Sequence, residues 1–145
     1  MVFSMSSGTR VARVLLAVTL FATASLKLWH FVLVGDWEVV LPVLQNRAVM
    51  SSLVVVEYLI GVAMLTPGAR LAAWCVAVIA TTGAAVVAWH AQFDETARSC
   101  GCLGRLPLTP AEHSLLSAAT LALAAIVILG SQHTSPVPPE DPRGS

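Results

Sequence analysis

The strongest chemical signal in the sequence is a pair of cysteines separated by one glycine, Cys100-Gly101-Cys102. Two thiols at this spacing can pair only in a small ring, and glycine gives the backbone the freedom that such a ring needs. A tight, exposed disulfide of this kind is expected to be strained and readily exchanged. Arg98 and Arg105 flank the pair, and nearby positive charge favours the nucleophilic thiolate. The spacing therefore indicates thiol–disulfide exchange, with a structural disulfide or two unreacted thiols as the alternatives.

A second signal comes from two charged residues, Lys27 and Glu57, that lie inside long apolar segments. An acidic group in the middle of a bilayer costs about 2.5–3.5 kcal/mol on insertion scales, so Glu57 must be paired, neutral or next to water. Helical rise places Lys27 ~10 Å and Glu57 ~13 Å from the loop that joins their two segments. These matching depths predict a structural ion pair. The alternatives are a proton or ligand site at Glu57, or a lysine that reaches the headgroups while Glu57 stays protonated.

The remaining cysteine and the histidines give weaker signals. Cys75 precedes His90 by 15 residues, or ~22 Å of helix, so it is too far from the cysteine pair for a disulfide. We interpret it as a small buried residue. His30, His90 and His113 are separated along the chain, whereas a metal site needs three or four converging ligands. The sequence therefore predicts polar anchors near the membrane surface and no metal site.

The chain that carries these residues has the composition of a membrane protein. Of its 145 residues, 57% are hydrophobic and 11% are charged, less than half the share of about 25% in soluble domains. The eight basic and eight acidic residues cancel, so the chain lacks the basic surplus that nucleic-acid binding requires. The expected environment is therefore the lipid bilayer, and no nucleic-acid partner is expected.

The apolar residues form four segments of 18 to 21 residues, close to the ~20 that cross a hydrocarbon core. Each segment is apolar nearly all round, which suits lipid or a bundle interior. We predict an all-α, integral membrane four-helix bundle with helices over residues 14–34, 48–65, 71–89 and 111–129.

The predicted four-helix domain covers residues 14–130. Residues 1–13 are expected to be a cytoplasmic N-terminal segment, and residues 131–145, which contain four prolines, a disordered tail. Arg10 and Arg13 before an apolar run are also typical of a signal peptide. Because the apolar run resumes after a single lysine, we favour an uncleaved first helix.

Local signals mark two of the helix boundaries. The sequence Leu-Thr-Pro-Gly over residues 65–68 predicts a tight turn between the second and third helices. Thr109, Pro110 and Glu112 have the spacing of a capping box with proline at the first helical position. These residues place the start of the last helix.

The distribution of arginines sets the expected orientation in the cell (inner) membrane. With the N-terminus inside, four arginines are cytoplasmic and three are not, and two of the four directly flank the first helix. We therefore expect both termini inside and the loop with Cys100 and Cys102 outside, where disulfides persist.

The segment Cys100–Gly104, directly before the last apolar segment, resembles the Cys-Gly-Cys-Phe-Gly motif of the MauE family, in the DoxX-like group of small four-helix membrane proteins. A leucine stands where phenylalanine is usual. Two further features are similar: a lysine with aromatic residues after it at the end of the first helix (residues 27–31), and Glu57 followed by Gly61. The resemblance covers roughly residues 11–130.

This resemblance implies a redox-associated membrane protein that assists maturation of disulfide-rich extracytoplasmic proteins in methylamine utilisation. By analogy, Cys100 and Cys102 would act as the catalytic pair of a thiol–disulfide oxidoreductase, exchanging with a thioredoxin-like extracytoplasmic partner. No bound cofactor is implied, although a quinone could take electrons from the single pair. The chain lacks the second cysteine pair with which quinone-linked disulfide generators relay electrons.

Two other functions remain open at the level of sequence. The chain could be a non-enzymatic subunit that stabilises a larger membrane complex or homo-oligomer, with a structural disulfide between Cys100 and Cys102. It could also be a small carrier built around Lys27 and Glu57, although four helices leave little room for a transport path.

Overall fold

The computed structural model describes residues 7–33, 46–93 and 109–131 of the chain. Nearly all of these residues are helical, in elements α1 (Ser7–Lys27), η1 (Leu28–Leu33, a π-helix), α2 (Arg47–Met64), α3 (Ala69–Phe93) and α4 (Pro110–Gly130). Four helices, the first of them continuing from α1 into η1, are long and apolar enough to cross a membrane. The predicted all-α membrane four-helix bundle is confirmed.

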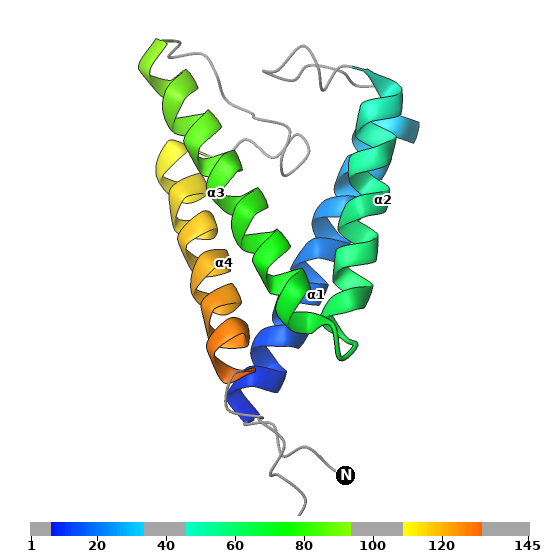
Figure 1. Ribbon diagram of the computed structural model, residues 1–145. Helices are drawn as coiled ribbons and strands as arrows, with labels where there is room; N and C mark the ends of the chain where they lie inside the picture. Colours follow the sequence, from blue (N-terminus) through cyan, green and yellow to red (C-terminus); the bar gives the residue numbers. More distant parts are fainter. Residues whose placement is uncertain (1–6, 34–45, 94–108, 132–145) are drawn as a thin grey trace, which may run out of the picture.

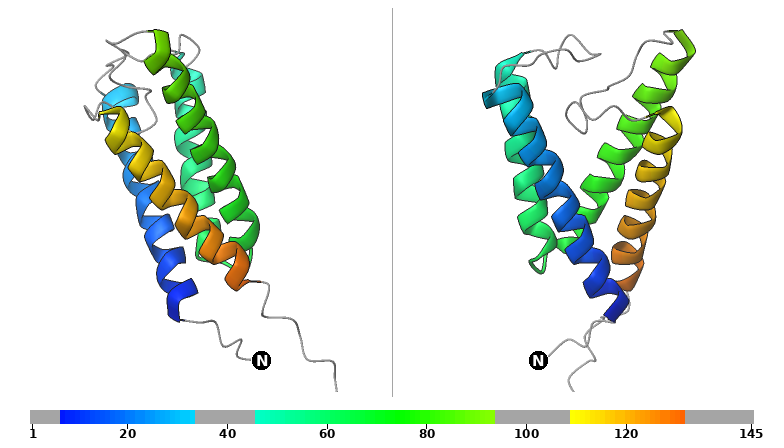
Figure 2. Two further views of the ribbon diagram at one scale, coloured as in Figure 1. Left: turned by 90° about the vertical axis from the view of Figure 1, so that its left-hand side faces the viewer. Right: turned by 180° about the vertical axis from the view of Figure 1, so that it is seen from behind.

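The helices form two pairs that meet at one end. α1 packs along α2 and α3 packs along α4, whereas the packing between α2 and α3 is much less extensive. The two pairs form the arms of a V in Figure 1, and the view from behind in Figure 2 shows the same separation. The closed end of the V contains the start of α1, the α2–α3 turn and the end of α4, and the arms diverge toward the end of α1 and the start of α4.

The hydrophobic core lies at the closed end of the V, and half of its buried members are alanine. Small side chains let helix backbones approach closely, which is how helices associate in a bilayer where apolar burial alone gives little driving force. All four helices contribute to this core, whose buried members are Ala12, Leu16, Ala17, Leu20, Met64, Ala69, Ala72, Ala73, Val76, Ala124, Val127 and Ile128.

The first helix begins earlier than predicted, at Ser7, so residues 7–13 are not a separate segment before the helix. Arg13 explains how helix can continue there, since its Nε donates a hydrogen bond to the Met64 carbonyl at 2.7 Å. The same guanidinium also donates to the Thr66 carbonyl. It thereby gives a partner to the Met64 carbonyl at the C-terminal end of α2, where positive charge is favourable, and a second partner to the Thr66 carbonyl, which also accepts from the Ala69 amide.

The other boundaries follow the local signals closely. α2 ends at Met64 and α3 begins at Ala69, which confirms the predicted turn. The capping box of α4 is also confirmed: Thr109 Oγ1 accepts a hydrogen bond from the Glu112 amide, and the Glu112 carboxylate accepts one from the Thr109 amide. α3 continues to Phe93, past the expected end at residue 89, because helical hydrogen bonds do not depend on the apolar stretch that ends there.

Gly130 of α4 lies against Thr9 of α1 in the closed end, and this contact predicts the effect of adding a single methyl group. A Cβ added at Gly130 would lie 2.3 Å from Oγ1 and 3.1 Å from Cγ2 of Thr9, a buried residue of α1. We expect Gly130→Ala to lower the free energy of unfolding by about 1–3 kcal/mol. The measurement is the thermal or denaturant stability of the purified protein in detergent.

Two further variants test the cause of that loss. Thr9→Ala in the Gly130→Ala background should recover part of the stability, because it removes both of the closest atoms. Gly8→Ala is the matched control, since a Cβ at Gly8 has nothing within 4 Å. An equal loss for Gly8→Ala and Gly130→Ala would contradict the close approach.

Candidate functional site

Lys27 and Glu57, which the sequence placed at matching depth, form an ion pair between α1 and α2. Lys27 Nζ donates a hydrogen bond to Glu57 Oε1, and both residues are almost fully buried, with 5% and 6% of their surfaces exposed. Lys27 is the last residue of α1, and the arms diverge toward that end of the helix, so the pair lies toward the open end of the V, beyond the alanine-rich core (Figure 1). The structure thus shows the contact, and the role of the pair remains a prediction.

Lys27 and Glu57 both lie on the buried face of their helices, where apolar residues are expected. On α2 the buried residues recur every three or four positions, and Glu57 lies in the middle of this stripe between Val54 and Gly61. Lys27 continues the corresponding stripe of α1 after Leu20 and Ala24. The two helices therefore face each other with one opposite charge each, at the place where apolar residues would otherwise pack.

The chain changes its winding directly after Lys27. Residues 28–33 form the π-helix η1, so Lys27 is the last residue of α1. π-helical turns are rare and are frequent at functional sites. η1 packs against both α1 and α2, so the wider turn stays part of the first arm.

A group of aromatic and small residues fixes α1 against α2 beside the ion pair. The rings of Phe21 and Tyr58 lie 5.8 Å apart between centroids, and the Tyr58 hydroxyl is hydrogen-bonded to Ser25 Oγ at 2.7 Å. Gly61 makes room for the Phe21 ring, because a Cβ there would lie 2.7 Å from Phe21 Cε1. Glu57 and Gly61, one turn apart on α2, thus both contact α1.

The ion pair leaves one buried polar atom without a partner. Among the described residues, Glu57 Oε2 is inaccessible to solvent and accepts no hydrogen bond. A buried carboxylate oxygen in this state loses the free energy of its hydration without a replacement contact. One of the two carboxylate oxygens of Glu57 is therefore paired, and the other, Oε2, lacks a hydrogen bond from the described residues.

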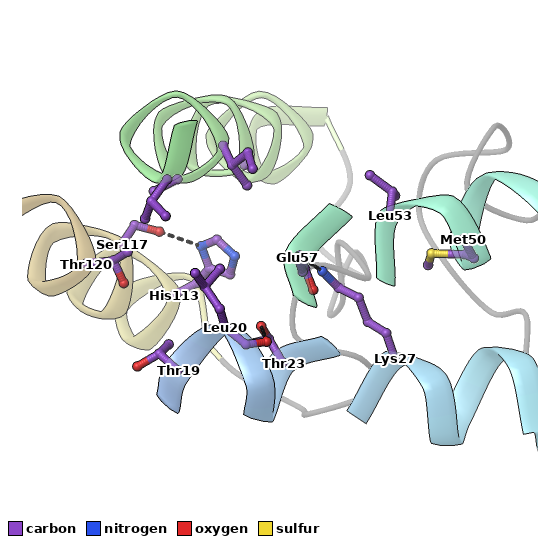
Figure 3. A pocket seen from close by; sticks show the side chains of 14 residues that line it. Thr19, Leu20, Thr23, Lys27, Met50, Leu53, Glu57, His113, Ser117 and Thr120 are labelled. Atoms are coloured by element: carbon purple, nitrogen blue, oxygen red, sulfur yellow. Dashed lines mark hydrogen bonds and ion pairs between the residues drawn. The ribbon is translucent and has the colours of Figure 1, made fainter. Parts of the chain in front are cut away.

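A cavity of about 180 Å³ lies beside the pair, between the two arms of the V. Figure 3 shows side chains of three helices, α1, α2 and α4, converging on it, and α3 forms the remaining wall. The lining residues are Thr19, Leu20, Thr23, Lys27, Met50, Leu53, Glu57, Val76, Ile79, Ala80, Gly83, His113, Ser117 and Thr120.

The polar side of the cavity opposite Lys27 and Glu57 comes from α4. His113, Ser117 and Thr120 follow one another at helical spacing, and Ser117 Oγ lies 3.5 Å from His113 Nδ1. The Thr120 hydroxyl donates to the Leu116 carbonyl of its own helix at 2.8 Å, which leaves its oxygen as an acceptor. The cavity thus has an apolar wall on α3, a wall on α2 in which Glu57 lies beside two apolar residues, and polar groups on α1 and α4.

The structure separates the candidate residues from the sequence into three groups. Lys27, Glu57 and His113 all line the cavity, so the structure gives His113 a cavity position that the sequence did not predict, while its role as an anchor near the membrane surface stays a prediction. Cys75 is half-buried in α3, without a disulfide partner among the described residues. Cys100 and Cys102 lie outside the described residues.

Several polar residues that line the cavity recur at helical spacing in the sequence, a pattern that the sequence analysis did not use. Thr19, Thr23 and Lys27 are four residues apart on one face of α1. His113, Ser117 and Thr120 have the equivalent spacing on α4. Hydroxyl-bearing residues at helical spacing inside apolar segments therefore mark the walls of this cavity.

The buried ion pair predicts a strongly non-additive response to mutation. Lys27→Met or Glu57→Leu alone leaves one unpaired buried charge, and each should lower the free energy of unfolding by about 3–5 kcal/mol. The double variant should recover most of that loss, because two apolar side chains replace both charges. Unfolding of the purified variants in mixed detergent micelles measures the cycle, and additive losses would contradict the pairing.

Glu57→Gln refines the same measurement. An amide oxygen can still accept the hydrogen bond from Lys27 Nζ, so this variant should lose less stability than Glu57→Leu. Equal losses for the two variants would mean that the hydrogen bond contributes nothing.

Comparison with known proteins identifies the family of this chain. The chain matches the family model described as Methylamine utilisation protein MauE over residues 5–131. No curated protein and no solved structure matches the chain. The matched range includes all four helices, the Lys27–Glu57 pair and the cysteine pair. This four-helix chain with a buried ion pair between its first two helices is a multi-pass membrane protein that belongs to the MauE family.

Proposed function

We propose that this protein exchanges thiols and disulfides with extracytoplasmic proteins through Cys100 and Cys102, and that it assists their oxidative maturation. The observation that carries the proposal is the Cys-Gly-Cys sequence inside the range that matches the family model. A pair with one intervening residue favours a strained, exchangeable disulfide. The family description suggests that the matured proteins serve methylamine utilisation.

The connectivity of the bundle supports a location for this chemistry. Residues 94–108, which include both cysteines, join the end of α3 to the start of α4, so the segment is attached at the open end of the V. The start of α1 and the end of α4 lie at the opposite, closed end. We propose that the closed end faces the cytoplasm and the open end the extracytoplasmic side, where disulfides persist.

The exchange reaction balances without a further reactant. A thiolate of a thioredoxin-like partner attacks the Cys100–Cys102 disulfide and forms a mixed disulfide, which releases the other cysteine as a thiolate. The partner's second thiolate then attacks the mixed disulfide, so that the partner leaves oxidised and the chain keeps two thiols. Arg98 and Arg105 favour the thiolate that leaves in the first step.

A trapping experiment tests the exchange. With one of the two cysteines replaced, the remaining thiolate can still attack the disulfide of an oxidised thioredoxin-like protein, which releases one cysteine of that protein as a thiolate. Acid quenching and alkylation keep the released thiolate from reversing the step, so Cys100→Ser or Cys102→Ser should yield a covalent mixed-disulfide complex. Non-reducing electrophoresis and mass spectrometry identify the complex. Cys75→Ser, in a half-buried helix position, is the matched control and should trap nothing.

The same pair of variants decides between exchange and a structural disulfide. If neither variant captures a partner and extracytoplasmic proteins still acquire their disulfides, the chain acts as an assembly subunit and the proposal fails.

Labelling of thiols tests the proposed orientation. In intact cells treated with a membrane-impermeant reductant, an impermeant maleimide should label Cys100 and Cys102. Thr66→Cys, in the exposed α2–α3 turn of a variant without these two cysteines, should be labelled only after permeabilisation. The reverse pattern would invert the topology.

A further inference from the structure

We propose that the cavity between the two arms binds the head group of a lipid-soluble quinone. The cavity, the unpartnered Glu57 oxygen and the polar groups of α4 are not used by the thiol exchange proposed above. The inference therefore stands on the described residues alone and does not depend on the cysteines.

The size of the cavity sets the size of the ligand. Its volume of about 180 Å³ slightly exceeds that of an engineered apolar cavity of ~150 Å³ that binds benzene. One six-membered ring with small substituents therefore fits. A long tail would extend into the bilayer, from which a lipid-soluble ligand can reach the cavity without crossing water.

The hydrogen-bonding groups of the first arm suit an oxygen on that ring. Lys27 carries three N–H donors and uses one of them for Glu57 Oε1, so a ring carbonyl can accept another. Glu57 Oε2 accepts no hydrogen bond from the described residues and is shielded from solvent, so a ring hydroxyl reaches it when the Glu57 carboxylate rotates toward the cavity that this residue lines. The pair thus provides a donor for a quinone and an acceptor for the corresponding quinol.

The second arm, formed by α3 and α4, supplies hydrogen-bonding groups for the oxygen on the opposite side of the ring. Ser117 and His113 lie across the cavity from Lys27 and Glu57 (Figure 3). Hydroxyl and imidazole groups can each donate or accept a hydrogen bond, depending on rotamer and tautomer. A ring with two oxygens in para positions therefore finds polar groups at both ends and apolar side chains, such as Ile79 and Ala80, along its face.

Other occupants of similar size satisfy fewer of these groups. A lipid acyl chain would fill the volume but would leave Glu57 Oε2 buried without a hydrogen bond. A small ammonium ion would pair with the carboxylate but would leave most of the apolar cavity empty. A two-electron carrier would also match the chemistry of a dithiol, since two thiols and a quinone give a disulfide and a quinol.

Binding of decylubiquinone to the full-length protein in lipid nanodiscs tests the proposal, with empty nanodiscs as the reference for partitioning into lipid. We expect saturable binding that Ala80→Phe, which fills the cavity from α3, weakens at least about tenfold. Val78→Phe is the matched control on the lipid-facing side of the same helix and should change the affinity less than about twofold. No saturable binding, or an equal effect of both variants, would overturn the proposal.

Glu57→Gln gives a test that does not depend on filling the cavity. The amide loses the charged acceptor for a ring hydroxyl, while Lys27 still supplies the donor for a ring carbonyl. The affinity for decylubiquinol should therefore fall about tenfold or more, with a much smaller change for decylubiquinone. A uniform change for both redox forms would overturn the assigned contacts, even if Ala80→Phe failed to fold.

The double variant Cys100→Ser/Cys102→Ser separates this inference from the proposed function. It should bind decylubiquinone as the unchanged chain does. Thiol exchange without quinone binding would overturn the quinone site alone, and quinone binding without partner capture would overturn the exchange function alone.

Discussion

The structure depends on one electrostatic constraint, which is that two opposite charges inside a bilayer must meet. Lys27 and Glu57 each lie on the interior stripe of their helix, and neither can be buried alone at an acceptable free energy. We therefore expect their contact to set the rotation and the axial position of α1 relative to α2. The packing of Phe21, Tyr58 and Gly61 adds to this arrangement, because it occupies the same helix contact.

The closed end and the open end of the bundle differ in the side chains that lie between their helices. At the closed end, alanines and the contact between Thr9 and Gly130 bring all four helices together. Toward the open end, the arms diverge, and the cavity between them is lined in part by hydroxyl-bearing and charged residues. Close packing thus provides stability at one end, and the polar groups that it excludes gather at the other.

The sequence predicted the features that depend on local or one-dimensional patterns. Four apolar segments, the turn before Ala69, the capping box at Thr109 and the equal depth of Lys27 and Glu57 follow from composition, spacing and helical rise. The start of α1 was missed because the hydrogen bonds of Arg13 to α2 depend on tertiary contact. The cavity was missed for the same reason, since its walls are distant in sequence.

The candidate site was predicted in part. The contact between Lys27 and Glu57 could be expected from matching depth, whereas the unpartnered oxygen of Glu57 depends on side-chain geometry. The position of His113 depends on how α4 is rotated in the bundle. Cys100 and Cys102 lie outside the described residues, so their role still rests on their spacing and on the family.

The V shape has a mechanical consequence. The alanine-rich closed end acts as the fulcrum of two levers, each about as long as a membrane-spanning helix. At the far end of a lever ~30 Å long, a change of ~5° in the angle between the arms is a displacement of ~3 Å. The width of the cavity therefore depends on methyl-sized contacts at the fulcrum, such as the one between Thr9 and Gly130, although neither of these two residues lines the cavity.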